Sequence, residues 1–373
     1  MNKFFPEISR NFGFGCMRFP LIGEEIDEEQ VAKMVDCFLE AGFNYFDTAH
    51  GYLNMRSEPV LKKCLTSRYP RERYILTDKL SNGFFEKEED IRPLFESQLE
   101  ACGVDYFDFY LMHCQNREFF AKFRRCNAYE VCQELKKEGK IRHLGISFHD
   151  RAEVLEMILN ECPEIEVVQI QFNYMDYSDP VVEAGRCYDV CVSRGIPVIV
   201  MEPVKGGSLA KLPVKAQAVI DSLGGGSAAS YAIRYAASFE NVAMVLSGMN
   251  SLREMEENVS FMQDFRPLTA DEFKALDKVV EEFRALKLIP CTACHYCTDG
   301  CPMGIRIPEL FQCMNTRTAF GIGNTDYYYN RIYTTEGTKA SDCISCGQCE
   351  GVCPQHLDIR DLLHDVARVF EGD

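Results

Sequence analysis

The sequence predicts an α/β protein, with a (β/α)8 barrel followed by a small, mostly helical C-terminal domain. From residue 13 to roughly residue 265, short apolar runs alternate with longer segments whose apolar residues recur at helical spacing. Strands that alternate with helices are typical of βαβ units and of a parallel sheet. Near the C-terminus this alternation stops, and two cysteine-rich runs take its place.

The expected strands are eight short apolar runs. They cover residues 13–17, 43–46, 74–79, 107–112, 142–146, 167–170, 197–201 and 242–246. Eight such units in one run indicate a (β/α)8 barrel. An open doubly wound sheet would carry a G-x-G-x-x-G turn after its first strand, whereas residues 13–18 read Gly-Phe-Gly-Cys-Met-Arg. We expect residues 1–12 to form a small hairpin under the barrel.

A helix start after the last barrel unit marks the expected domain boundary. Thr269 and Glu272 have the spacing of a capping box. We therefore expect a barrel over residues 1–268, a connecting helix over 269–289 and a C-terminal domain over 290–373. A final helix is expected over residues 359–370, and apart from the βα units we find no internal repeat.

Composition and charge exclude several classes of partner. The 373 residues carry a formal net charge of -17, which argues against binding to nucleic acid or to anionic membranes. No stretch approaches the 18 apolar residues of a membrane span, and the first residues lack the apolar run of a signal peptide. Nineteen cysteines without such a signal indicate a reducing compartment rather than a disulfide scaffold. We expect a cytoplasmic protein.

The two cysteine runs share one spacing, C-x2-C-x2-C-x3-C-P. In two-cluster ferredoxins the fourth cysteine of such a run binds the cluster of the other run. The pattern assigns one [4Fe–4S] cluster to Cys291, Cys294, Cys297 and Cys353, and a second to Cys343, Cys346, Cys349 and Cys301. Zinc sites usually pair two C-x2-C halves and give no role to the C-x3-C-P tail. We therefore expect a ferredoxin-like domain with two clusters.

Polar residues gather where three neighbouring barrel strands end, which is where this fold carries its reactive groups. They are Asp47 and Tyr52 after the second strand, Lys79 at the end of the third and His113 after the fourth. A tyrosine has a free pKa of about 10, and a neighbouring ammonium lowers it. An aspartate can hold that lysine, and a histidine can orient a carbonyl oxygen. Each residue alone could be a helix cap, an ion-pair partner or a core histidine, but the four together favour catalysis.

This constellation resembles the aldo-keto reductases over residues 1–265. The resemblance implies that Tyr52 is the general acid for a small carbonyl substrate, that Lys79 and Asp47 tune it, and that His113 positions the substrate. It also implies NAD(P)H as the cofactor. The nucleotide contacts that it suggests are Ser147 and Gln169 at the carboxamide, Met201 in place of the stacking aromatic, and Ser247, Gly248, Glu257 and Asn258 around the pyrophosphate and adenine.

Two departures from the family pattern leave the nucleotide open. Phe148 stands where an asparagine usually follows the serine, and Gly248 and Glu254 stand where a basic pair would read the 2′-phosphate. The resemblance therefore leaves NADH and NADPH as alternatives.

The whole chain resembles the iron–sulfur subgroup of aldo-keto reductase-related oxidoreductases. Nicotinamide transfers two electrons as hydride and a [4Fe–4S] cluster transfers one, so a flavin normally mediates between them. FMN is thus an alternative cofactor. Three functions stay open: a carbonyl reductase with structural or regulatory clusters, an oxidoreductase that passes electrons to a partner protein, and a redox sensor.

Overall fold

The computed structural model describes residues 2–179, 182–320, 325–334 and 338–372. The chain divides into two compact units, which we describe separately. The first unit comprises Met1–Asp179, Glu183–Pro203 and Ile233–Leu268, and the second comprises mainly Val204–Ala232 and Thr269–Asp373. Residues 204–232 and the chain from Thr269 onward form the second unit. The domain boundaries expected at residues 268 and 290 stay a prediction.

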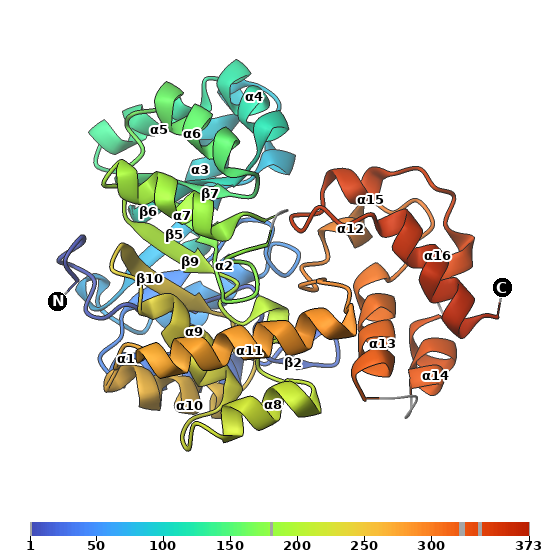
Figure 1. Ribbon diagram of the computed structural model, residues 1–373. Helices are drawn as coiled ribbons and strands as arrows, with labels where there is room; N and C mark the ends of the chain where they lie inside the picture. The colour runs from blue at the N-terminus through green and yellow to red at the C-terminus, as the bar shows by residue number, and fades with distance from the viewer. Residues whose placement is uncertain (1, 180–181, 321–324, 335–337, 373) are drawn as a thin grey trace. The chain divides into compact units, whose positions relative to one another are not determined.

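The first unit is a closed barrel of eight parallel strands (Figure 1), which confirms the predicted fold. The strands are β1 (Phe12–Gly15), β4 (Tyr45–Asp47), β5 (Ile75–Leu80), β6 (Phe107–Gln115), β7 (Ile141–Phe148), β8 (Val167–Gln171), β9 (Val198–Met201) and β10 (Val242–Ser247). Each pairs with its sequence neighbour, and β1 closes the barrel against β10. A two-stranded hairpin, β2 (Leu21–Ile22) with β3 (Glu25–Ile26), was not foreseen and follows β1.

Helices of the first unit follow the strands and cover the sheet. They are α1 (Glu28–Glu40), α2 (Ser57–Leu61), α3 (Glu88–Cys102), α4 (Arg117–Arg125), α5 (Ala128–Lys137), α6 (Ala152–Glu161), α7 (Ala184–Ser193) and α10 (Leu252–Gln263). In α1 the apolar residues at helical spacing are the buried ones, and the Asp27 side chain caps the helix by accepting a hydrogen bond from the Gln30 amide. This amphipathic pattern explains why α1 packs on the sheet.

The amino end of the barrel is closed by the N-terminal segment. Phe5 and Ile8 are buried in a core cluster with strand residues such as Tyr45 and Phe109. Residues 2–11 form turns rather than paired strands, so the hairpin expected there is absent from the described part of the segment. Apolar burial, rather than strand pairing, holds this plug in place.

Glu7 of this plug joins an ionic network with His143 of β7 and Glu166, and this network predicts a pH dependence of stability. His143 Nε2 lies 2.6 Å from Glu7 Oε1, and its Nδ1 lies 3.7 Å from Glu166 Oε2. Burial opposes a charge on His143, but hydrogen bonds to Glu166 and Glu7 outweigh it and raise the pKa of His143. Burial likewise opposes the charge on Glu166, yet hydrogen bonds from His143 and Lys136 lower its pKa to about 2.

We expect His143→Gln to lower the free energy of unfolding by about 1 kcal/mol near pH 5.5. The stabilisation by His143 is complete below its unfolded pKa of about 6.5 and disappears as pH rises through the higher folded pKa. The loss should therefore shrink at pH 9, as measured by urea unfolding under anaerobic conditions. His364→Gln, at an exposed helix position, is the control. An equal loss at both pH values would contradict this assignment.

The second unit contains an internal repeat that the sequence analysis did not find. Its helices are α8 (Val214–Asp221), the first half of α9 (Ala228–Ala237), α11 (Ala270–Leu286), α12 (Tyr296–Asp299), α13 (Ile307–Phe320), α14 (Thr325–Tyr328), α15 (Gln348–Gly351) and α16 (Ile359–Phe370). The short helices α12 and α15 begin 52 positions apart, as do α13 and α16. Within each pair the two helices contact one another (Figure 1).

The backbone of the repeat is the same in both copies. Residues with positive φ recur at the same offset, at Ala293 and Ser345, His295 and Gly347, and Gly304 and His356. The capping box at Thr269 starts α11, and the final helix α16 covers residues 359–370 as expected. The two cysteine runs therefore fold into matching turns.

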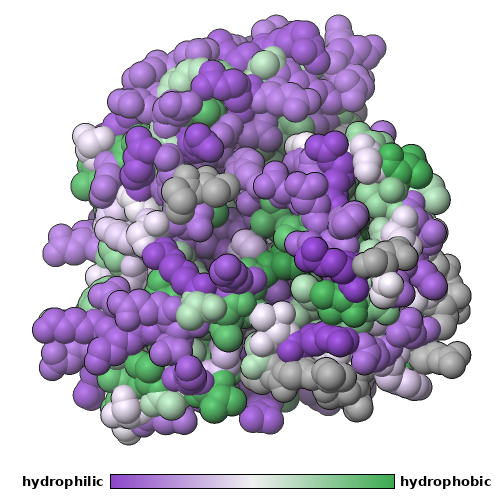
Figure 2. Space-filling view, turned by 45° about the vertical axis from the view of Figure 1, so that its right-hand side comes forward, coloured by the Kyte–Doolittle hydropathy of each residue, from purple (hydrophilic) through white to green (hydrophobic). Residues whose placement is uncertain are grey.

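Among the described residues, no helix combines the length and apolar character that crossing a membrane requires. The face drawn in Figure 2 is mostly hydrophilic, with small separate hydrophobic patches. Small patches of this kind are normal on protein surfaces.

Candidate active site and cluster sites

The four polar residues predicted at the strand ends lie together at the carboxyl end of the barrel. Lys79 Nζ donates to Asp47 Oδ1 at 2.6 Å and lies 3.4 Å from the Tyr52 hydroxyl. It also donates to the Thr48 carbonyl at 2.6 Å. The rings of Tyr52 and His113 meet edge-on, with centroids 5.8 Å apart. The ammonium is thus held between a carboxylate and a phenol.

Burial and charge act in opposite directions on this group. Burial is the largest influence on Tyr52 and raises its pKa, while the Lys79 ammonium lowers it by a smaller amount. Lys79 therefore lowers the pKa of Tyr52 as expected, but burial raises this pKa by more. Burial disfavours the charge on Lys79, yet Asp47 and Tyr52 overcome it and raise the pKa of Lys79. At neutral pH the phenol keeps its proton and the lysine its charge.

His113 is neutral in this setting. Burial, Lys79 and His149 together lower the pKa of His113 well below its usual range. Its Nδ1 lies 2.7 Å from Ser81 Oγ, a contact that the sequence analysis missed. Ser81 stands two residues after Lys79, so strand alternation directs both side chains to one face of the sheet. That spacing is the only signal in the sequence that could have identified Ser81.

Two predicted nucleotide contacts lie beside these residues. Gln169 Nε2 donates to Asp47 Oδ2 at 3.0 Å, and its Oε1 has no hydrogen bond among the described residues. Ser147 Oγ lies 3.4 Å from His149 Nε2 and 4.0 Å from the sulfur of Met201. These ends of β7, β8 and β9 offer hydroxyl and amide groups that fit a carboxamide.

The other predicted nucleotide contacts follow β10. Asn258 Nδ2 donates to Ser247 Oγ at 3.3 Å, which joins the strand end to helix α10. Gly248 is exposed and lies next to the Arg18 side chain. Glu257 is also exposed, and the structure does not bring its side chain to the other predicted contacts. At the start of α10 the backbone amides already have partners, since Leu252 N donates to Gln30 Oε1 and Glu254 N donates to Ser251 Oγ.

The cysteines of the second unit form two groups that match the predicted ligand sets. A small cavity is lined by Cys301, Cys343, Cys346 and Cys349, together with apolar side chains. Burial raises the pKa of Cys297, and the charged groups that raise it further are Cys294, Cys291 and Cys353. In each group the fourth cysteine comes from the other run, as cross-ligation requires.

The donor set of both groups suits iron–sulfur clusters. Each group supplies four cysteine thiols, which are the ligands of a [4Fe–4S] cluster. A cubane holds its thiolates at separate corners, and the Ala293 amide already donates to Cys291 Sγ at 3.4 Å. The residues therefore fit [4Fe–4S] clusters.

The two cysteine groups differ in how deeply the surrounding residues are buried. Thr292, in the first run, is 2% exposed, whereas Ile344 at the equivalent position is 60% exposed. The first site is covered by residues 205–206, which follow β9 in sequence and belong to the second unit. Lys205 Nζ donates to Gln355 Oε1 at 3.1 Å, beside the fourth cysteine of the second run. Gly206 packs against the Thr292 backbone.

We expect Gly206→Ala to destabilise the second unit by at least about 2 kcal/mol. Gly206 has φ +62, and an added Cβ would lie 2.3 Å from the Thr292 carbonyl oxygen. Displacing Thr292 moves its neighbour Cys291, so iron content should fall as well. Gly224→Ala is the matched control, because Gly224 has φ +76 and nothing within 4 Å. Equal thermal unfolding and iron content in the two variants would contradict the close approach.

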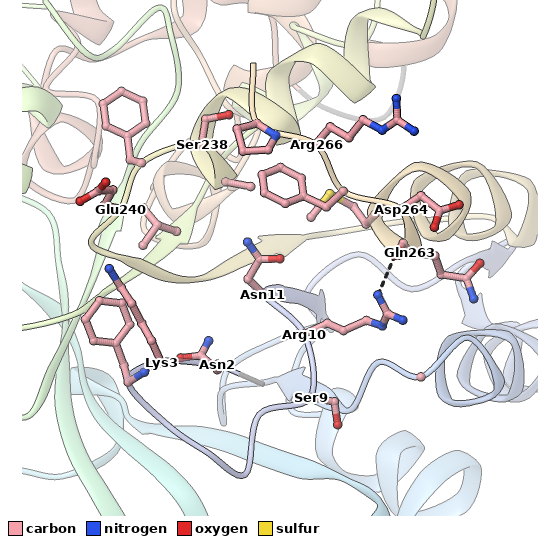
Figure 3. A pocket seen from close by; sticks show the side chains of 18 residues that line it. Asn2, Lys3, Ser9, Arg10, Asn11, Ser238, Glu240, Gln263, Asp264 and Arg266 are labelled. Atoms are coloured by element: carbon pink, nitrogen blue, oxygen red, sulfur yellow. Dashed lines mark hydrogen bonds between the residues drawn. The ribbon is translucent and has the colours of Figure 1, made fainter. Parts of the chain in front are cut away.

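The hollow shown in Figure 3 lies at the other end of the barrel, with a volume of about 1010 Å³. Its lining includes Asn11, just before β1, and Gly42, before β4. Arg10 donates to the Gln263 carbonyl at 2.6 Å, drawn as a dashed line in the figure. In barrels of this class the amino end serves stability, so this hollow is not the candidate active site.

Comparison with known proteins adds two family matches. A model described as the aldo/keto reductase family matches residues 11–281, and one described as a 4Fe-4S dicluster domain matches residues 290–358. L-galactose dehydrogenase of Arabidopsis thaliana is 27% identical, over 70% of this chain and 86% of its own length.

Two further proteins are similar to part of this chain. NADH-specific methylglyoxal reductase of Escherichia coli (strain K12) is 29% identical, over 47% of this chain and 57% of its own length. Among solved structures, the holo form of aldo-keto reductase AKR11C1 from Bacillus halodurans superposes with a TM-score of 0.61 at 26% identity. That match covers 72% of this chain and 91% of the other.

Proposed function

Because this chain belongs to the aldo/keto reductase family and carries a 4Fe-4S dicluster domain, we propose that it reduces a small carbonyl compound with a nicotinamide cofactor. The observation that carries the proposal is the position of the Lys79 ammonium, 2.6 Å from Asp47 and 3.4 Å from the Tyr52 hydroxyl. Few structural roles require a buried lysine to contact both a carboxylate and a phenol at the reactive end of a barrel.

Each residue of the group has a defined task in this reaction. Tyr52 donates its proton to the carbonyl oxygen as negative charge develops there. Lys79 stabilises the phenolate that remains, and Asp47 holds Lys79 in place. Neutral His113 donates a hydrogen bond that orients the carbonyl oxygen. A bound nicotinamide would supply the hydride for the carbonyl carbon.

The nicotinamide contacts are part of the proposal. Ser147 and the Oε1 atom of Gln169 are suited to bind the carboxamide, and the Arg18 side chain beside Gly248 is suited to bind a phosphate. Glu254, which accepts a hydrogen bond from the Asn250 amide at 2.9 Å, disfavours a 2′-phosphate nearby. The sequence at this point therefore supports NADH, which is also the cofactor named for the methylglyoxal reductase.

We further propose that the eight cysteines bind two [4Fe–4S] clusters by cross-ligation. The clusters would supply one-electron chemistry or would make the unit rigid. Carbonyl reduction with a nicotinamide needs only the rigidity. The unit has a modest core of its own, and small domains of this size commonly depend on metal for folding.

A second candidate function is electron transfer between the clusters and a partner protein or a flavin bound in the barrel. The dicluster domain favours it, because a purely structural role does not need two clusters. Rapid cluster reduction by NADH under anaerobic conditions, or FMN in the purified protein, would support this function instead.

The decisive first experiment is anaerobic purification followed by iron, sulfide and flavin analysis and a NADH and NADPH oxidation assay. Methylglyoxal and an aromatic aldehyde serve as carbonyl probes. We expect about eight iron atoms per chain and carbonyl-dependent oxidation of NADH. Oxidation that does not depend on any carbonyl, with the clusters becoming reduced, would overturn the first function in favour of the second.

A further inference from the structure

We propose that Ser81 is a positioning residue that keeps the ring proton of His113 on Nε2. Ser81 Oγ lies 2.7 Å from His113 Nδ1, and each residue is only 7% exposed. The catalytic consequence rests on the proposed carbonyl reduction, whereas the tautomer itself depends only on this contact.

The strand register explains why the two side chains meet. Lys79 pairs with Leu111 and Leu80 with Met112 in the parallel β5–β6 ladder, so Ser81 continues the ladder opposite His113. Adjacent strands lie roughly 4.8 Å apart, and alternate residues share one face. The end of β5 therefore carries two groups that act on the site: Lys79 toward Asp47, and Ser81 toward His113.

The direction of the hydrogen bond follows from counting protons. A neutral imidazole has one N–H and one acceptor nitrogen, and the buried His113 is neutral. Among the described residues, the Ser81 hydroxyl has no hydrogen-bond partner other than Nδ1. If Nδ1 carried the proton, the hydroxyl proton would be buried without an acceptor, which is unfavourable. The hydroxyl therefore donates to Nδ1, and the ring proton lies on Nε2.

This tautomer determines what His113 can do. Nε2 has no hydrogen-bond partner among the described residues, so its N–H is available to a carbonyl oxygen. The opposite tautomer would present a lone pair to that oxygen and repel it. Ser81 thus acts on the substrate through His113, in the way that outer hydrogen-bond partners fix histidine tautomers elsewhere.

The tautomer can be measured without any assay of activity. Oxidised protein labelled with 15N-histidine contains seven histidines, and a His113→Gln variant assigns the His113 signals. We expect a protonated Nε2 and an unprotonated Nδ1 in the wild type, and a mixture of tautomers in Ser81→Ala. A protonated Nδ1 in the wild type, or an unchanged tautomer in Ser81→Ala, would overturn the proposal.

Kinetics provide the matching functional test. Ser81→Ala should lower kcat/KM for carbonyl reduction about tenfold, the scale typical of outer hydrogen-bond partners, and Ser81→Thr should restore most of it. Ser230→Ala is the control, because it removes a buried hydroxyl that donates only to the Ser227 carbonyl. Activity of Ser81→Ala equal to that of the control would contradict the positioning role.

The two proposals can fail separately. If the wild-type protein reduces no carbonyl, the proposed function fails, and the 15N measurement still decides the role of Ser81. If the wild type is active but the tautomer does not respond to Ser81→Ala, only the present inference fails.

Discussion

Tyr52→Phe should reduce kcat for NADH-dependent carbonyl reduction by about 10²- to 10⁴-fold, the range of a lost general acid. The variant keeps the ring that lies 4.9 Å from Lys79 Nζ and removes only the hydroxyl. Without that proton donor, the developing charge on the carbonyl oxygen has no acid to neutralise it. The measurement is steady-state kinetics with methylglyoxal under anaerobic conditions.

A second tyrosine provides the control for this loss. The hydroxyl of Tyr174 is buried and has no hydrogen-bond partner among the residues that the structure describes, so Tyr174→Phe removes the same atom without breaking a described hydrogen bond. We expect this variant to keep its activity and iron content. Comparable activity in Tyr52→Phe and Tyr174→Phe would rule out Tyr52 as the acid.

Cys346→Ser should remove about half of the iron, because one of two four-iron clusters loses a thiolate ligand. The cavity that Cys346 lines would then hold three cysteines, and the packing of the second unit would lose its metal support. We expect this unit to unfold at a lower temperature and to become sensitive to proteases. Iron analysis and limited proteolysis measure the two effects.

The control for this variant is a cysteine outside both runs. Cys37, half-buried in α1, should tolerate replacement by serine with its iron content unchanged. Equal iron in Cys346→Ser and Cys37→Ser would show that Cys346 is not a ligand.

The barrel was predictable because its strands are buried on both faces. Such strands form continuous apolar runs in the sequence. Two of these buried runs lead directly to Asp47 and to Lys79, the residues of the candidate active site. The hairpin of β2 and β3 was not predictable, since two residues per strand are too few to create an alternating pattern. Three of its four residues, including Leu21, are exposed.

The shared cysteine spacing was visible in the sequence, but the full extent of the repeat in the second unit was not. Its turns include residues with positive φ, and at one equivalent pair these are Ala293 and Ser345. A glycine would have indicated a positive φ in the sequence, but an alanine or a serine does not. The grouping of residues 204–232 with this unit depends on contacts distant in sequence, such as Lys205 with Gln355. Patterns within a single segment contain no information about such pairs.

The residues of the candidate site could be predicted from the sequence, but their pKa values could not. Strand-end positions identified Lys79, Tyr52 and His113, because parallel strands bring their carboxyl ends together. The net rise in the pKa of Tyr52 depends on burial, which no local pattern expresses. Ser81 was missed because one serine has many ordinary roles and gains significance only from its distance to His113.

Hydride transfer can be followed with NADH deuterated at C4 of the nicotinamide, with anaerobically purified protein and methylglyoxal. We expect one deuterium on the former carbonyl carbon of the product, and we expect Tyr52→Phe to slow this transfer by at least about 100-fold. Loss of deuterium to solvent while the clusters become reduced, with no labelled product, would contradict this expectation.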